Sequence, residues 1–253
     1  MTVLETKELF VSFGKKKALE NVNISLKKGS FTAVIGRNGS GKSTLLSALC
    51  GYLRYGGSLR VMGHELCELS GASRAEILSY LPQTPAAAHI TVEELLCMAT
   101  SAVSKSLSLG NSQKNTEKIE NAIKKARLCD LRHKYLDRIS GGELRRAYVG
   151  MILSVDSEII LLDEATASLD LDSGDRIFSL MKKQCERGKT VLLVTHDLSS
   201  AVKYADDLLV LDGGRQIYFG NTKDAIDSKI IERTLRVKSF FAQEQTFFAP
   251  ISD

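Results

Sequence analysis

The sequence has few cysteines and no long apolar run, and both shortages restrict what the protein can be. Five cysteines are scattered through 253 residues, and no two have the C-x-x-C spacing typical of a zinc site. An odd, unpatterned set gives no disulfide framework either, so we expect buried thiols in a reducing cytoplasm. No stretch of about 18 or more apolar residues is present, so no segment is expected to span a membrane.

Strong charge bias, repeats and low-complexity segments are also missing. The net charge is only +4, which nucleic acid or an anionic membrane could exploit, but a solvated surface is the favoured interpretation. Lys15–Lys17 is accordingly expected to be an exposed turn and not a binding tract. Residues 1–7 lack the apolar core of a signal peptide. With 43% hydrophobic residues the chain can bury an ordinary core, so we expect a folded, soluble protein that reaches a membrane only through a partner.

What the sequence does contain is a glycine-rich loop between a strand pattern and a helix pattern. Phe31–Ile35 has strand character, Thr44–Cys50 has helical spacing, and Gly36–Ser43 between them reads G-x-x-x-x-G-K-S. The glycines permit a tight turn whose N–H groups point at a polyanion, and the positive end of the helix adds to this field. A glycine turn in an ordinary α/β unit is the alternative. The lysine and the hydroxyl favour a nucleoside triphosphate, with Lys42 at its terminal phosphates and Ser43 at Mg2+.

Strand patterns flank this loop on both sides. Val3–Val11 alternates like an edge strand, Ala18–Leu26 predicts a second strand, and Phe13 lies at the tip between them. Leu78–Leu81 is strand-like. Short all-apolar runs, suited to strands covered by helices on both faces, are Ile159–Leu162, Val191–Val194 and Leu208–Leu211. Near the end of the chain, Arg236–Phe241 and Thr246–Ala249 are predicted to pair as a hairpin.

Between Thr84 and Leu153 the pattern becomes helical. Thr91 and Glu94 form a capping box that starts a helix continuing through Met98. The polar, serine-rich residues 101–115 are predicted to be a connection. Residues 117–128 then form an amphipathic pattern, whose apolar face comprises Ile119, Ala122, Ile123 and Ala126. A further helix is predicted over residues 175–185.

Two polar clusters follow these elements. Asp163 and Glu164 close an apolar strand, and ligands sit at the carboxyl ends of strands in doubly wound sheets. Asp163 is therefore predicted to hold Mg2+ and Glu164 to orient or deprotonate a water, although two solvated carboxylates would look similar. Ser140 and Glu143 fit a capping box, which alone indicates an ordinary helix start. The glycines between them, however, leave N–H groups bare for an anion.

Taken together, these motifs resemble those of ABC-type ATPase cassettes over nearly the whole chain. The elements that occur in the family's order are Gly36–Ser43, Gln83, Ile139–Glu143, Leu161–Glu164, Ser168–Asp170 and His196. The resemblance implies an α/β fold: a P-loop NTPase core with a mixed sheet, an antiparallel β-subdomain and a helical insert. Residues 1–253 would form a single ATP-binding domain, with the core in 1–83 and 154–253 and the helical subdomain in about 84–153.

The resemblance also implies a head-to-tail dimer with two ATP molecules sandwiched between the subunits. Catalysis would involve Glu164, His196 and Lys42, and the metal would be held by Ser43, Gln83 and Asp163. Asp170 would join the two subunits. The implied ATP-binding residues are Phe13, Gly36, Arg37, Asn38, Gly39, Ser40, Gly41, Lys42, Ser43, Thr44, Gln83, Ser140, Gly141, Gly142 and Glu143.

Two of these assignments compete with plainer ones, and four positions depart from the family pattern. Gln83 could be a polar turn residue, and His196 an ordinary histidine like His64, His89 and His133. The departures are Phe13 for tyrosine, Ile139 for leucine, Glu143 for glutamine and Ala165 for proline. None removes a phosphate donor or the catalytic carboxylate, so we expect identical subunits with two competent sites.

The work that ATP would drive is a separate question. A motor subunit docked on an integral-membrane permease is favoured, at the cytoplasmic face of the membrane, with a periplasmic or lipoprotein substrate-binding protein as an indirect partner and no nucleic acid. The segments 51–64, 78–95 and the terminal hairpin look like importers of ferric siderophores, haem or cobalamin. Other transporter classes, and soluble assembly ATPases such as those serving iron–sulfur clusters, remain alternatives. DNA-repair and ribosome-associated members usually have coiled-coil insertions or two cassettes, which this chain lacks.

Overall fold

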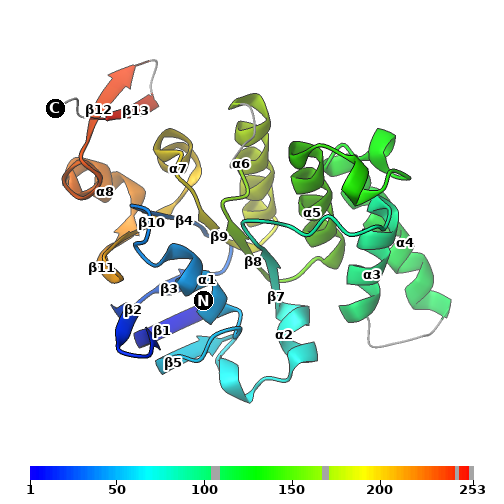
Figure 1. Ribbon diagram of the computed structural model, residues 1–253, viewed down its shortest axis with the longest axis horizontal. Helices are drawn as coiled ribbons and strands as arrows, with labels where there is room; N and C mark the ends of the chain where they lie inside the picture. Colours follow the sequence, from blue (N-terminus) through cyan, green and yellow to red (C-terminus); the bar gives the residue numbers. More distant parts are fainter. Residues whose placement is uncertain (104–108, 167–170, 243–244, 251–253) are drawn as a thin grey trace.

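The computed structural model describes residues 1–103, 109–166, 171–242 and 245–250. Within these ranges eleven strands form one sheet, in the order β6-β5-β1-β2-β11-β10-β4-β9-β8-β7, with β3 beside β1 (Figure 1). Helices α3–α5 lie at one end of the molecule, and the hairpin β12–β13 lies at the other (Figure 1). The expected α/β cassette fold is therefore confirmed.

Five neighbouring strands run parallel and form the centre of the sheet. They are β10 (Asp207–Asp212), β4 (Phe31–Gly36), β9 (Thr190–Val194), β8 (Ile159–Asp163) and β7 (Leu78–Leu81). Alternate residues face opposite sides, so Val34 and Leu192 pack toward helix α1 (Lys42–Leu49). Ala33 and Leu193 instead pack in the cluster that includes α6 (Leu171–Glu186) and α7 (Leu198–Tyr204). Both faces are buried, which explains the all-apolar runs.

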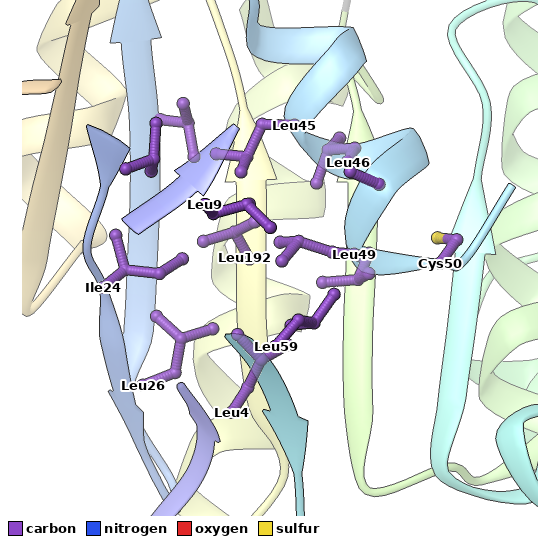
Figure 2. Packing of buried hydrophobic residues seen from close by; sticks show 14 of the residues in the cluster. Leu4, Leu9, Ile24, Leu26, Leu45, Leu46, Leu49, Cys50, Leu59 and Leu192 are labelled. Atoms are coloured by element: carbon purple, nitrogen blue, oxygen red, sulfur yellow. The ribbon is translucent and has the colours of Figure 1, made fainter. Parts of the chain in front are cut away.

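The antiparallel part of the sheet covers the other side of α1. It contains β1 (Thr2–Phe13), β2 (Lys16–Val22), β3 (Ser25–Lys27), β5 (Gly56–Val61) and β6 (His64–Glu65). Figure 2 shows leucines of these strands meeting those of α1: Leu4, Leu9 and Leu59 lie against Leu45, Leu46 and Leu49. All six side chains are fully buried. The antiparallel strands and the parallel strands therefore share one hydrophobic core around α1.

Two strand predictions in this part are wrong in detail. β1 is not an edge strand, because β5 and β2 pair with its two sides, a long-range outcome that alternation cannot reveal. The stretch 18–26 is two strands. The Thr6 hydroxyl interrupts the ladder there: it donates to the carbonyl of Val22 at 2.8 Å and accepts from the N–H of Ile24 at 3.0 Å. Both strands pair with β1, and the ladder is interrupted between β2 and β3.

The helical insert contains α3 (Val92–Val103), α4 (Leu109–Lys125) and α5 (Gly141–Val155), after α2 (Gly71–Ile77). Its own apolar cluster joins Leu96 of α3, Ile123 of α4 and Ala147 of α5. The predicted apolar face of residues 117–128 is confirmed as buried. The predicted connection over 101–115 is wrong at both ends, because α3 runs to Val103 and α4 begins at Leu109. A polar helix exposed along one side has the composition of a loop, which explains the error.

The remainder of the chain returns to the core and then leaves it. Strand β11 (Arg215–Asn221) pairs with β10, and α8 (Thr222–Asp227) and α9 (Ile230–Leu235) follow. The hairpin of β12 (Val237–Ala242) and β13 (Gln245–Pro250) is confirmed. Short 3-10 turns cover Leu66–Glu68, Cys129–Leu131 and Leu136–Arg138. No helix in the described ranges is long and apolar enough to cross a membrane.

The prediction of buried thiols holds for two of the five cysteines. Cys50 and Cys185 are buried, and burial raises the pKa of each thiol to about 12. Cys67, Cys97 and Cys129 are exposed, so that prediction is wrong for them. Their positions lie on a short turn or on the solvent side of the insert, where a small residue needs no burial.

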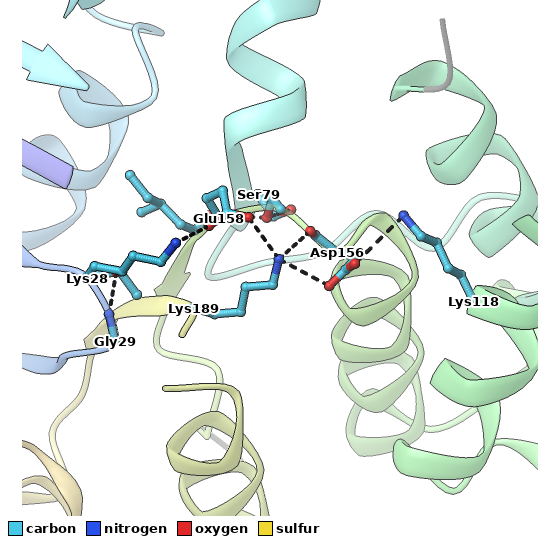
Figure 3. A network of polar contacts seen from close by, with 10 residues as sticks. Lys28, Gly29, Ser79, Lys118, Asp156, Glu158 and Lys189 are labelled. Carbon is cyan, nitrogen blue, oxygen red and sulfur yellow. Dashed lines mark hydrogen bonds and ion pairs between the residues drawn. The ribbon is translucent and has the colours of Figure 1, made fainter. Parts of the chain in front are cut away.

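A polar network joins the insert to the core at the amino ends of the parallel strands. Lys189 lies 3.2 Å from Asp156 and 3.3 Å from Glu158, and Lys28 and Lys118 extend the network to either side (Figure 3). Asp156 caps the end of α5. Lys189 is mostly buried, with its side chain 15% exposed, whereas the outer pairs are open to solvent and contribute little each. The network therefore fixes the C-terminal end of α5 to the sheet.

Candidate functional site

The carboxyl ends of four parallel strands meet at one edge of the sheet. β4 leads into the glycine loop, β8 ends at Asp163, β9 precedes His196, and β7 precedes Gln83. Their polar residues converge on Glu164, whose side chain is 13% exposed. The Gln83 amide donates to Glu164 Oε2 at 2.7 Å, and His196 Nε2 lies 2.8 Å from Oε1. Three residues predicted as separate site members thus form one cluster.

The phosphate loop is shaped by close backbone approach. A Cβ at Gly36 would collide with the carbonyl oxygen of Leu211, and one at Gly41 would lie 2.9 Å from that of Ala18. Gly41 also has a φ of 99° and caps α1, a conformation that glycine adopts without strain. Lys42 is 6% exposed and donates to the carbonyls of Gly36 at 2.9 Å and Arg37 at 3.1 Å. The ammonium is therefore held inside the turn that a triphosphate would enter.

Burial sets the electrostatics of this loop. It lowers the pKa of Lys42, while the carboxylates of Glu164 and Asp163 act in the opposite direction. Burial also raises the pKa of Asp163, and a hydrogen bond from Ser43 is the strongest opposing influence. A cation and two carboxylates thus share a dry site, where charge interactions are stronger than in water.

Asp163 and Ser43 suit a hard divalent cation. Asp163 is 2% exposed, and its buried Oδ1 has no hydrogen-bond partner among the described residues. An orphaned carboxylate oxygen beside a hydroxyl offers the oxygen ligands that Mg2+ prefers. The described ranges contain no group of three or more His, Cys, Asp or Glu side chains able to hold a metal.

A cleft of about 530 Å³ opens beside the loop, within the range of small-molecule sites. Its lining contains Phe13, Lys16, Lys17, Ala18, Asn38, Gly39, Ser40, Gly41, Lys42, Ser43, Thr44, Gln83, Glu164, Gly213 and Gly214. Phe13, 52% exposed, offers a bare aromatic face there. Lys16 and Lys17 are exposed, as predicted, and they also line this cleft.

Hairpins bring in from a distance the five lining residues that were missed: Lys16, Lys17, Ala18, Gly213 and Gly214. Phe13 and Lys16 are cross-strand neighbours in the β1–β2 hairpin, which brings the lysines to the cleft. Gly213 and Gly214 form the β10–β11 turn, and Gly214 N–H donates to the carbonyl of Ser40 at 3.2 Å. The glycine pair between two strand patterns is the one sequence signal that could have flagged this turn.

The Ser140 turn lies at the start of α5 and does not line this cleft. Its capping box is present: Ser140 Oγ accepts from Glu143 N–H at 3.3 Å, and Ser140 N–H donates to Glu143 Oε2 at 2.8 Å. The hydrogen bonds that the Ser140 N–H and hydroxyl donate to the Glu143 carboxylate lower the pKa of Glu143. A Cβ at Gly141 would meet nothing within 4 Å. Asp170, the predicted dimer contact, falls outside the described residues.

One further side chain reaches the cluster, from the second turn of α5. Arg145 Nη1 donates to the carbonyl oxygen of Glu164 at 2.7 Å, and Nη2 donates to that of Gln83 at 2.8 Å. One turn later, the Tyr148 hydroxyl donates to the carbonyl of Ala86 at 2.8 Å. The sequence pattern gave no signal for either contact, because each depends on the packing of α5 against the segment after β7.

Comparison with known proteins places this geometry in a family. The family model described as ABC transporter matches residues 19–167, more than half of the chain. The chain is 30% identical to the probable siderophore transport system ATP-binding protein YusV of Bacillus subtilis, over 99% of this chain and 92% of that protein. It is also 30% identical to the hemin import ATP-binding protein HmuV of Chelativorans sp., with 93% of both chains covered.

Solved structures agree with these relatives. A nucleotide-free ATP-binding cassette from an ABC transporter superposes with a TM-score of 0.81 at 26% identity, covering 93% of this chain and 98% of that one. The ATP-binding cassette MJ0796, seen as a dimer bound to ADP and Pi, gives a TM-score of 0.78 at 25% identity, covering 87% and 98%. This chain therefore belongs to the ABC transporter family, as a nucleotide-binding ATPase cassette.

Proposed function

We propose that the protein powers import of an iron-siderophore, haem or cobalamin-type substrate through a separate membrane permease. The observation that carries this proposal is similarity over nearly the full length to import cassettes, including relatives named for siderophore and hemin transport. The iron(3+)-hydroxamate import protein FhuC of Bacillus subtilis is 29% identical over 94% of this chain. The cassette would lie at the cytoplasmic face of the membrane, held there by the permease.

Hydrolysis would proceed by in-line attack of water on the γ-phosphorus, with catalysis mainly by placement of charge. Lys42 would leave the carbonyls of its own loop to bind the terminal phosphates, and Phe13 would stack on adenine. Glu164 would orient or deprotonate the water, while His196 and Gln83 hold its two oxygens. Ser43, Gln83 and Asp163 would hold Mg2+, which neutralises phosphate charge when bound.

The Ser140 turn would act on ATP held by a second copy of the chain. Its bare glycine lies open to solvent, and the turn does not line the chain's own cleft. Two chains arranged head to tail would place each Ser140–Glu143 turn against the phosphates of the partner. The dimeric state of MJ0796 supports this arrangement.

Glu164→Gln tests the chemistry of the site. The variant keeps one oxygen that can accept a hydrogen bond from Gln83 or His196, but it loses the carboxylate. Losing one well-placed stabilising group costs roughly 3–4 kcal/mol, about a hundredfold to a thousandfold in rate. We expect turnover to fall by that factor while ATP binding is retained, together with dimers that persist on ATP and Mg2+. Turnover at the wild-type rate would remove Glu164 from its role.

Membrane attachment tests the transport assignment. We expect the cassette to sediment with membranes when its permease is present and to be released when the permease gene is deleted.

A short permease helix would dock beside Gln83 and residues 84–98, so crosslinks should map there. A soluble assembly ATPase, such as one serving iron–sulfur clusters, would stay in the supernatant in both strains, and that result would favour the second candidate.

A further inference from the structure

Helix α5 is attached to the core at both ends, by contacts of different kinds. At its C-terminal end, Asp156 joins the network around Lys189 (Figure 3). Near its N-terminal end, Arg145 spans the carbonyls of Gln83 and Glu164. Only the second attachment touches the residues of the site, and it begins five residues after Ser140.

The two carbonyls that Arg145 binds belong to the residues whose side chains bind each other. Gln83 donates to the Glu164 carboxylate at 2.7 Å, so a single guanidinium holds both backbones of that pair. Glu164 also has a φ of 49°, an uncommon value for a residue other than glycine. Its backbone conformation therefore needs support from neighbours, and the bond from Arg145 to its carbonyl, with the bond from its own N–H to Val194 at 3.0 Å, supplies it.

Only arginine suits this geometry. The guanidinium is a planar fork with several fixed donors, whereas the lysine ammonium is a compact point charge. Burial lowers the pKa of Arg145 and the charge of Glu164 raises it. The group nevertheless stays charged at neutral pH, since guanidinium groups do not lose their proton in proteins. The contact is therefore a permanent, charge-assisted clamp that does not respond to pH.

We propose that Arg145 is a positioning residue, which fixes the Gln83–Glu164 pair to α5 so that the carboxylate follows the Ser140 end of that helix. Movement of the insert relative to the core would then shift the Glu164 carboxylate, which orients the attacking water, together with the turn that closes on the partner's ATP. The inference rests on the proposed role of Glu164. It adds that the rate of ATP hydrolysis depends on the position of α5 relative to the core.

Arg145→Ala in the full-length chain, compared with Tyr148→Phe, tests the proposal. Both variants remove a hydrogen bond from α5 to the segment after β7, but only Arg145 also holds Glu164. Misplacing a catalytic group by about 1 Å can cost roughly a hundredfold in rate. We expect kcat to fall about tenfold to a hundredfold in Arg145→Ala, with the Kd for ATP changed by less than about threefold, and kcat of Tyr148→Phe to stay within about twofold of wild type.

Three results would overturn the proposal: an unchanged kcat in Arg145→Ala, equal losses in the two variants, or a loss of ATP affinity as large as the loss of kcat. If Arg145→Ala does not fold, Arg145→Lys decides, because one ammonium replaces a two-carbonyl fork. An intermediate kcat supports the clamp and a wild-type kcat overturns it. Glu164→Gln is assayed alongside. Normal ATPase turnover in Glu164→Gln would reject the proposed function. Lost turnover in Glu164→Gln, together with wild-type turnover in the Arg145 variants, would reject the clamp alone.

Discussion

The two glycine turns of this protein differ in how much of their surroundings the chain itself supplies. The turn at Gly36–Ser43 is enclosed: Lys42 is buried, Gly36 and Gly41 face backbone atoms, and the β10–β11 turn closes over it. Among the described residues, the Ser140 side chain bonds to its own Glu143, and Gly141 faces open space. The fold requires the first pair of glycines and does not require Gly141. In the proposed head-to-tail dimer, the triphosphate held by the partner would approach this open glycine.

The largest loss of ATPase turnover is expected from Gly141→Asp, in the open turn at Ser140. The side chain meets no atom of its own chain, and an acidic residue in the first turn of α5 favours the helix dipole, so folding and ATP binding to one chain should be kept. A carboxylate facing the partner's triphosphate should prevent closure and lower ATPase turnover by about a hundredfold or more.

Gly71→Asp is the matched control for that experiment. Gly71 also opens a helix after a serine cap and also faces open space. Turnover of the isolated protein should be unchanged. Equal turnover in the two variants would mean that the Ser140 turn contacts no phosphate.

Lys42→Ala should damage the enclosed turn instead. The ammonium is placed to move from two backbone carbonyls to the phosphates, and hydrogen bonds to charged groups contribute roughly 1.5–3 kcal/mol. We expect the Kd for ATP to rise about tenfold to a hundredfold, measured by calorimetry on the single chain. Gly141→Asp should bind ATP normally in the same assay. Unchanged affinity in Lys42→Ala would contradict the role of the loop.

The difference between the turns also shows what the sequence can predict. The enclosed turn and the strand ends were predicted correctly because each motif is local: a strand, a loop and a helix start within about 20 residues. Lys16, Lys17 and Gly214 were missed because two hairpins bring them to the cleft from opposite ends of the chain. Arg145 was missed for the same reason, since its partners Gln83 and Glu164 are distant in sequence.

The errors in the fold have a related origin. Alternation identified β1 and the strand that follows it, but not the pairing of β1 with β5, which lies more than 40 residues further on. The sequence of residues 111–115 is polar, and the stability of α4 comes from its later apolar face. Local composition there indicates a loop, and tertiary packing decides otherwise.

Phe13→Ala tests the part of the cleft that would hold the adenine base of ATP. A ring stacked on adenine contributes about 1 kcal/mol, so ATP affinity should fall roughly fivefold, while Phe13→Tyr should bind like wild type. Tripolyphosphate, which has no base, separates the two parts of the cleft. Its affinity should be unaffected by Phe13→Ala and weakened by Lys42→Ala. An equal loss for ATP and tripolyphosphate in Phe13→Ala would show that the ring does not contact the base.

The smallest effect is expected at Asp163, whose buried carboxylate lies beside the Gly36–Ser43 turn and destabilises the nucleotide-free fold. Burial raises the pKa of Asp163 above its ordinary value of 3.8, so the folded state favours the neutral acid. Its ionised form therefore destabilises the nucleotide-free protein. This destabilisation is absent below pH 3.8 and is fully present once the pH has risen through the folded-state pKa. Asp163→Asn should raise the melting temperature at pH 7 by about 2–4 °C for each 1 kcal/mol recovered, and the gain should shrink toward pH 4. The variant should also abolish the Mg2+ dependence of ATP binding. A melting temperature that falls at pH 7 would show that Lys42 and Ser43 already compensate the buried charge without Mg2+.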